Sequence, residues 1–139
     1  MTKIKKASLS KVLGLVLILI TFCHSHLFAT DFYVNKSASG NNNGTSWQNA
    51  WVTFSNINWS LIQPGDKIYV SGGSDSTIYT EPLIVAKSGT VGNYIQILKS
   101  YESLHSGRVV IKPNNGIGVQ LNNKNYIVVK GFEISNPSG

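Results

Sequence analysis

The chain of 139 residues is poor in the residue types that build several common classes of functional site. It has one cysteine, Cys23, and three histidines, His24, His26 and His105. A disulfide framework needs paired cysteines and a zinc site needs clustered Cys or His ligands, so both classes are excluded. His105 stands in a polar loop with no acidic cluster beside it in the sequence, which favours neither a metal ligand nor a catalytic triad.

Charged residues are also scarce, since Asp, Glu, Lys and Arg make up 13% of the chain. The formal net charge is +6, but four of the twelve basic residues lie before position 12. Residues 30–139 carry eight basic and six acidic side chains, which gives a net charge of 8 − 6 = +2. This balance provides no electrostatic footprint for nucleic acid, and we expect no nucleic-acid partner.

Residues 1–29 are typical of a secretory signal peptide. Lysines precede an apolar run over residues 12–22, and Leu27-Phe28-Ala29 resembles a cleavage site. The run is shorter than the roughly 18 uncharged residues of a membrane span, and Ile20-Thr21-Phe22 lacks the small residues expected before a lipoprotein cysteine. We therefore expect a bacterial protein that is secreted, periplasmic or on the cell surface, with no membrane association after cleavage.

Short apolar-alternating runs return at nearly constant intervals between Ile95 and Asn136. Alignment of the run at Ile95 with the run at Val119 gives a sequence offset of 119 − 95 = 24, and alignment of Val109 with Phe132 gives 132 − 109 = 23. A third run, at Ile84, precedes Val109 by a similar offset, 109 − 84 = 25. A strand repeat of roughly 20 to 50 residues indicates a solenoid, so residues 83–139 are predicted to form stacked coils with Asn and Gly at their corners.

Residues 30–82 are predicted to form an N-terminal cap on these coils. Residues 31–34 alternate as a strand, and Thr45-Ser46-Trp47-Gln48 fits a helix capping box. Pro64-Gly65 ends the helix that this box begins, and Asp66 is interpreted as a turn residue that accepts nearby backbone N–H bonds rather than as a catalytic carboxylate. A short amphipathic helix over about 46–61 is predicted by five residues at helical spacing, namely Trp47, Trp51, Phe54, Ile57 and Leu61.

The tryptophans of this segment have two interpretations. In one, the three tryptophans, Trp47, Trp51 and Trp59, form a sugar-stacking platform, and in the other Trp47 and Trp51 are buried against the first layer of the solenoid. Their helical register with Phe54 and Leu61 favours burial. Trp59 lies off the apolar face and is the better candidate for exposure.

Five separated segments, 31–35, 44–47, 64–70, 88–97 and 126–134, resemble one protein family in the order in which that family has them. The chain resembles the N-terminal part of right-handed parallel β-helix proteins of the pectate-lyase-like superfamily, and within it the bacterial lyases of pectate, alginate and chondroitin. The resemblance implies an all-β fold, with a cap made of a strand and a short helix and with the first coils of an incomplete β-helix.

The resemblance also implies a function. We expect the N-terminal fragment of an exported protein that binds or cleaves extracellular, uronate-containing polysaccharide by β-elimination. In that reaction a basic side chain removes the proton next to the carboxylate, while calcium or another cation neutralises the carboxylate. The alternative is a non-catalytic surface adhesin or structural β-helix protein. We expect the full-length protein to be a monomer.

No residue of this chain matches the catalytic groups of the family, which project from its middle coils. No catalytic, cofactor-binding or metal-binding residue is therefore assigned, calcium is expected only in the full-length protein, and this fragment is expected to be inactive. Residues 30–139 alone are expected to fold poorly, because an open coil exposes strand edges. Four charged residues in or beside the strands either line a groove or are solvated outward side chains, and the second interpretation is favoured, namely for Arg108, Lys112, Lys130 and Glu133.

Overall fold

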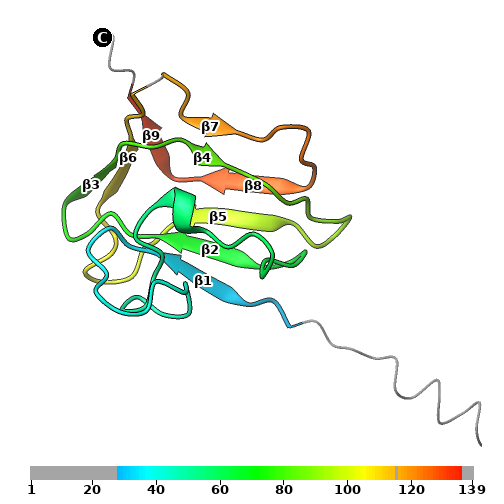
Figure 1. Cartoon of the computed structure of the whole chain (residues 1–139), viewed down its shortest axis with the longest axis horizontal. Helices are drawn as coiled ribbons and strands as arrows, with labels where there is room; N and C mark the ends of the chain where they lie inside the picture. The colour runs from blue at the N-terminus through cyan, green and yellow to red at the C-terminus, as the bar shows by residue number, and fades with distance from the viewer. Residues whose placement is uncertain (1–27, 115, 136–139) are drawn as a thin grey trace, which may run out of the picture.

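A computed structural model describes residues 28–114 and 116–135 (Figure 1). The predicted signal peptide lies outside these residues, apart from Phe28 and Ala29. One 3-10 helix, η1 (Phe54–Asn56), occurs among the described residues, and the other regular elements are strands. The strands are β1 (Asp31–Val34), β2 (Lys67–Val70), β3 (Ser76–Tyr79), β4 (Leu83–Ile84), β5 (Ile95–Lys99), β6 (Arg108–Ile111), β7 (Val119–Gln120), β8 (Ile127–Lys130) and β9 (Phe132–Ile134).

The strands form three sheets, with the orders β1-β2-β5-β8, β3-β6-β9 and β4-β7. Every pairing between these strands is parallel. From β2 onward, the chain visits the three sheets in turn and then returns to the first, one level further along the stack (Figure 1). This arrangement is a parallel β-helix, which confirms the predicted all-β solenoid; its right-handed sense stays a prediction.

The strand register corrects most of the predicted repeat. Val109 lies opposite Phe132, as their sequence offset predicts. Ile95 instead lies opposite Ile127, an offset of 127 − 95 = 32, and Val119 lies opposite Leu83, an offset of 119 − 83 = 36. The alignments of Ile95 with Val119 and of Ile84 with Val109 are therefore wrong. All three sheets use the same Val and Ile alternation, so the strand pattern alone does not identify the sheet to which a strand belongs.

Alternation along the strands explains the core. Successive side chains of a strand point to opposite faces, so every second residue points into the coil. Ile95 and Ile97 are fully buried from β5, as are Val109 and Ile111 from β6. Burial of this kind stabilises by roughly 1.5–3 kcal/mol for each large apolar side chain. The other fully buried apolar side chains of the strands and the turn after β4 are Val34, Ile68, Val70, Tyr79, Leu83 and Val85.

The predicted helix over 46–61 is wrong, because the structure has only the short η1 in this segment. Asn, Ser and Thr side chains here bond to nearby backbone groups and thereby compete with helical hydrogen bonds. Asn43 accepts from the N–H of Thr45, so Thr45 closes a turn instead of beginning a helix, and Thr53 caps η1. The apolar residues therefore have helical spacing without a helix.

The cap segment closes the N-terminal end of the core. Trp51 is 1% exposed and its ring stacks on Phe32 at a centroid distance of 5.3 Å, while Phe54 stacks on Tyr79 at 4.6 Å. Burial of Trp51 is thus confirmed. Leu61, by contrast, is 49% exposed, and the adjacent Ile62 is buried in its place.

The same segment also covers the free edge of β1. The N–H of Tyr33 donates to the carbonyl of Gly44, and the N–H of Trp51 donates to the carbonyl of Tyr33. The N–H of Asn35 donates in turn to the carbonyl of Trp51. Because an unpaired strand edge invites pairing with another chain, these bonds protect the first strand. At the other end of the stack, the inward residues Ile127 and Val129 are only half-buried.

Candidate functional site

The outer face of the four-stranded sheet carries two rows of outward side chains. The strand register defines both rows, since directly paired residues lie side by side across neighbouring strands. Figure 1 shows the four strands stacked in the order β1, β2, β5, β8. One row is Asp31, Lys67, Gln96 and Val128, and the other is Tyr33, Tyr69, Leu98 and Lys130.

Three hollows lie on this outer face and share parts of their walls. The first, here called the acidic hollow, has a volume of about 360 Å³. Two carboxylates line it, from Asp31 on β1 and Glu102 in the loop after β5. Its remaining walls are Tyr69, Ser100 and Tyr101.

The second, here called the basic hollow, has a volume of about 320 Å³ and adjoins the acidic hollow, because Tyr69 and Tyr101 line both. Two lysines, Lys99 and Lys130, contribute its charge. Its remaining walls are Gln96, Leu98 and Val128.

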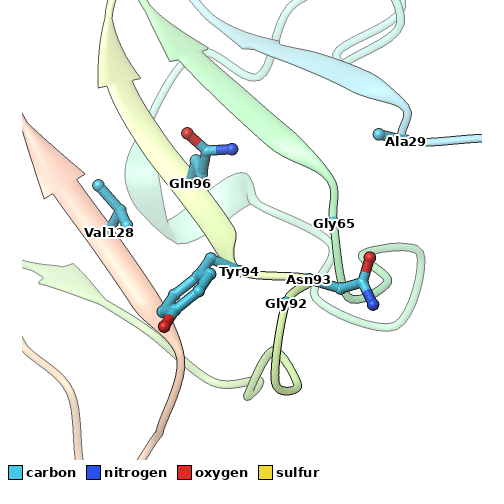
Figure 2. Close-up of a pocket in the computed structure, with 7 residues that line it drawn as sticks. All are labelled: Ala29, Gly65, Gly92, Asn93, Tyr94, Gln96 and Val128. Carbon is cyan, nitrogen blue, oxygen red and sulfur yellow. The ribbon is translucent and has the colours of Figure 1, made fainter.

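The third hollow, of about 300 Å³, lies at the start of β5 and shares Gln96 and Val128 with the basic hollow. Figure 2 shows these two side chains on adjacent strands, with the ring of Tyr94 below them. Tyr94 packs edge-on against Tyr126 at a centroid distance of 5.9 Å. The three hollows therefore lie next to one another across β1, β2, β5 and β8, and each has at least one tyrosine in its wall or in the wall it shares with a neighbour.

Tyr101 stands between the acidic and basic hollows. Its side chain is 74% exposed, and the Nζ of Lys99 lies 4.6 Å from its ring centroid, a distance typical of a cation–π contact. The same Nζ donates hydrogen bonds to the carbonyls of Ser106 and Gly107. Lys99 is therefore held in place beneath the ring, whereas Lys130 is exposed and its side-chain Nζ makes no hydrogen bond or ion pair with residues 28–114 or 116–135.

A cluster of polar and aromatic side chains packs next to the acidic hollow. The rings of Trp47 and His105 stack with their centroids 3.8 Å apart. The indole Nε1 of Trp47 donates a hydrogen bond to Oε2 of Glu102 at 2.8 Å. The ring of Tyr33 packs against the ring of Trp47 at a centroid distance of 4.7 Å, and its centroid lies 6.1 Å from that of Tyr69. These contacts connect the cap to β2 and orient one of the two carboxylates of the hollow.

The electrostatics of this cluster follow from burial and from the two carboxylates. Burial, and then the nearby charges of Asp31 and Glu102, raise the pKa of the Tyr33 phenol. Burial lowers the pKa of His105, although the charge of Glu102 acts in the opposite direction. Burial therefore favours the neutral form of His105, whose Nδ1 lies 2.9 Å from the Oγ of Ser71.

Ser71 and His105 are in contact as a catalytic nucleophile and its base would be, but the Ser71 oxygen is not accessible to a substrate. Ser71 is 1% exposed, and its Oγ accepts a hydrogen bond from the N–H of Gly73. A substrate carbonyl has no approach to an oxygen buried in this way. We therefore interpret the pair as a structural link between the turn after β2 and the loop after β5.

Other residues weighed from the sequence have structural roles. Asp66 is 3% exposed and its two carboxylate oxygens accept from the N–H groups of Thr30 and Gln63 at 2.8 and 2.7 Å, which confirms its turn role. Arg108 and Glu133 form an exposed two-bond ion pair between β6 and β9, with both distances 2.8 Å. Those hydrogen bonds lower the pKa of Glu133 and raise that of Arg108.

The exposure of Trp47 and Trp59 differs from the prediction. Trp47 is half-exposed on the outer face rather than buried in the core. Trp59 is half-buried against the core and lines a separate apolar hollow of about 260 Å³ with Phe54, Pro82 and Ile84. Alternation of Lys67-Ile68-Tyr69-Val70 is a signal that places Tyr69 outside, but no sequence signal indicates that Tyr101 and Glu102 return to the same face.

The described residues also set limits on cofactors. Residues 28–114 and 116–135 contain no group of three or more His, Cys, Asp or Glu side chains placed to hold a metal ion, so they do not fit the calcium that the resemblance implies. No helix in the described part of the chain has the length and apolarity needed to cross a membrane.

The fold places the chain among parallel β-helix proteins. No protein-family model and no curated protein matches it. The fold alone does not define an activity, because the same architecture supports unrelated functions.

Proposed function

We propose that the outer face of the four-stranded sheet binds an extracellular polysaccharide. The observation that carries the proposal is the row of three adjoining hollows, which share Tyr69, Tyr101, Gln96 and Val128 as walls. β1 and β8 are three strand spacings apart, roughly 14 Å, so the row of hollows suits a short run of linked sugars better than one sugar.

The lining has the chemistry that sugars require. The C–H face of a sugar ring is apolar and packs against an aromatic ring, for which Tyr69, Tyr94 and Tyr101 are available. The amide of Gln96 supplies both a donor and an acceptor for hydroxyl groups. Lys130 supplies a positive charge for the carboxylate of a uronate, which is the sugar that the family resemblance implies.

Binding to an immobilised or gel-embedded polysaccharide tests the proposal. Retardation of the protein in native gels that contain pectate, alginate or chondroitin gives a dissociation constant for each polymer. We expect Tyr101→Ala to weaken binding about tenfold, a loss of about 1.4 kcal/mol, because it removes one stacking ring. Leu104→Ala is the matched control, since Leu104 is 73% exposed in the same loop and lines none of the three hollows. Equal retardation of the wild type in gels with and without polymer would refute the proposal.

β-Elimination is the second candidate function, and the observation that favours it is the pair of lysines in the basic hollow. A lysine is suited either to removing the proton next to a carboxylate or to neutralising that carboxylate. Incubation with the same three polymers, followed by the absorbance of unsaturated products, tests it directly. Binding without such absorbance supports the non-catalytic alternative, an adhesin or structural β-helix protein.

A further inference from the structure

The acidic and basic hollows adjoin one another and carry opposite charges. Asp31 and Glu102 line the first, and Lys99 and Lys130 line the second. Lys67 lies directly across from Asp31 in the strand register, but it lines neither hollow. A carboxylate of a uniform polyanion that enters the acidic hollow therefore meets Asp31 and Glu102, where like charges repel.

Glu102 is well placed to impose this repulsion. The indole of Trp47 donates to Oε2 of Glu102 at 2.8 Å, which holds the carboxylate at the rim of the hollow. Its other oxygen accepts no hydrogen bond from any residue in 28–114 or 116–135. A carboxylate oxygen is an acceptor only, so it is satisfied by a sugar hydroxyl or an N-acetyl N–H and repels another carboxylate.

The basic hollow, by contrast, favours a sugar that carries a carboxylate. Lys99 is engaged with two carbonyls and with the ring of Tyr101, so its charge is fixed at the floor. Lys130 is exposed, and its Nζ makes no hydrogen bond or ion pair with the described residues. Its ammonium group is therefore available to pair with a carboxylate. Tyr101 separates the two hollows and offers its ring to a sugar on either side.

We infer that this face recognises an alternating polysaccharide, in which an acidic sugar occupies the basic hollow and the neutral sugar linked to it occupies the acidic hollow. The inference rests on the proposed polysaccharide-binding function and narrows it to one class of polymer. It distinguishes an alternating uronate–N-acetylhexosamine chain from a polymer made of uronate alone.

The test compares three polymers on the purified protein by isothermal titration calorimetry: unsulfated chondroitin, which alternates glucuronate with N-acetylgalactosamine, polygalacturonate, and a neutral β-glucan. We expect chondroitin to bind at least about tenfold more tightly than polygalacturonate, since like-charge contact at Glu102 penalises the second polymer. Equal or tighter binding of polygalacturonate overturns this inference but leaves the proposed function standing. Absence of binding to all three polymers overturns both.

Two charge variants distinguish charge repulsion at Glu102 from a general preference for one of the two polymers. Glu102→Gln keeps the shape and an acceptor for the Trp47 N–H but removes the charge, so we expect polygalacturonate to gain affinity and the ratio between the two polymers to fall toward one. Lys130→Gln is expected to weaken both polymers about equally, and Lys112→Gln, on an exposed lysine outside the three hollows, serves as the control. An unchanged ratio in Glu102→Gln overturns the inference.

Discussion

The ring of Trp47 lies flat against the ring of His105, with the centroids 3.8 Å apart and the planes inclined by 13°. This contact joins the N-terminal cap to the loop between β5 and β6. The hydrogen bond from Trp47 to Glu102 and the contact between Ser71 and His105 reinforce it on either side. One cluster therefore stabilises the cap and also orients a carboxylate of the acidic hollow.

Replacement of Trp47 by Ala is expected to lower the free energy of unfolding by about 1–3 kcal/mol, because it removes both ring contacts and the hydrogen bond to Glu102. Urea denaturation followed by circular dichroism measures the loss. Trp47→Phe keeps a ring without the N–H donor, and we expect it to lie between the wild type and Trp47→Ala. Equal stability of the three proteins would show that the cluster contributes nothing.

The neutral state of His105 predicts a pH dependence of stability. Burial lowers the pKa of His105 in the folded protein below the ordinary value of 6.5, so the unfolded chain binds this proton more readily. The stability that depends on neutral His105 is present above that value and is lost as the pH falls from it through the lower folded pKa. We expect the melting temperature of the wild type to fall more than that of His105→Gln between about pH 8 and pH 5. Parallel curves would contradict this.

Gly72 and Gly107 lie back to back on neighbouring coils. A Cβ on Gly72 would overlap the carbonyl oxygen of Gly107, and a Cβ on Gly107 would overlap the carbonyl oxygen of Gly72. Because both obstacles are backbone, Gly72→Ala is expected to lower the free energy of unfolding by about 1–3 kcal/mol. Ser74→Ala, at an exposed position nearby, is the control for thermal denaturation. A Gly72→Ala protein as stable as this control would be evidence against the close stacking of the two coils.

Asp66 contributes through its two hydrogen bonds to the backbone. Asparagine retains one acceptor oxygen, so Asp66→Asn loses one of the bonds to Thr30 and Gln63 and leaves a donor without its partner. We expect a loss of about 1–3 kcal/mol in the free energy of unfolding. Asp75→Asn, at an exposed acidic residue, should be neutral by the same urea titration. Similar losses in both variants would point to net charge rather than to the turn.

Part of this fold follows from the sequence. Alternation within the strands identifies the inward residues, such as Ile95 and Ile97, and the repeated strands identify a solenoid. The turn role of Asp66 also follows, because a carboxylate after Pro-Gly has backbone N–H groups within reach.

The remainder depends on contacts between distant segments. Residues 46–61 have the apolar spacing of a helix, but side-chain bonds to the backbone and the pairing of Trp51 with β1 replace helical hydrogen bonds. The coil lengths depend on the loops, which carry no periodic signal. The acidic hollow forms only when Asp31 and Glu102, which are far apart in the sequence, come to line the same hollow beside Tyr69.

The most direct test of the central claim is to map a bound oligosaccharide by nuclear magnetic resonance on the 15N-labelled protein. We predict that chondroitin oligosaccharides shift the amide signals of outward residues on β1, β2, β5 and β8, with the largest changes at Tyr69, Gln96 and Tyr101. Shifts confined to the sheet β3-β6-β9, or no shifts at saturating ligand, would contradict the assignment of this face as the binding site.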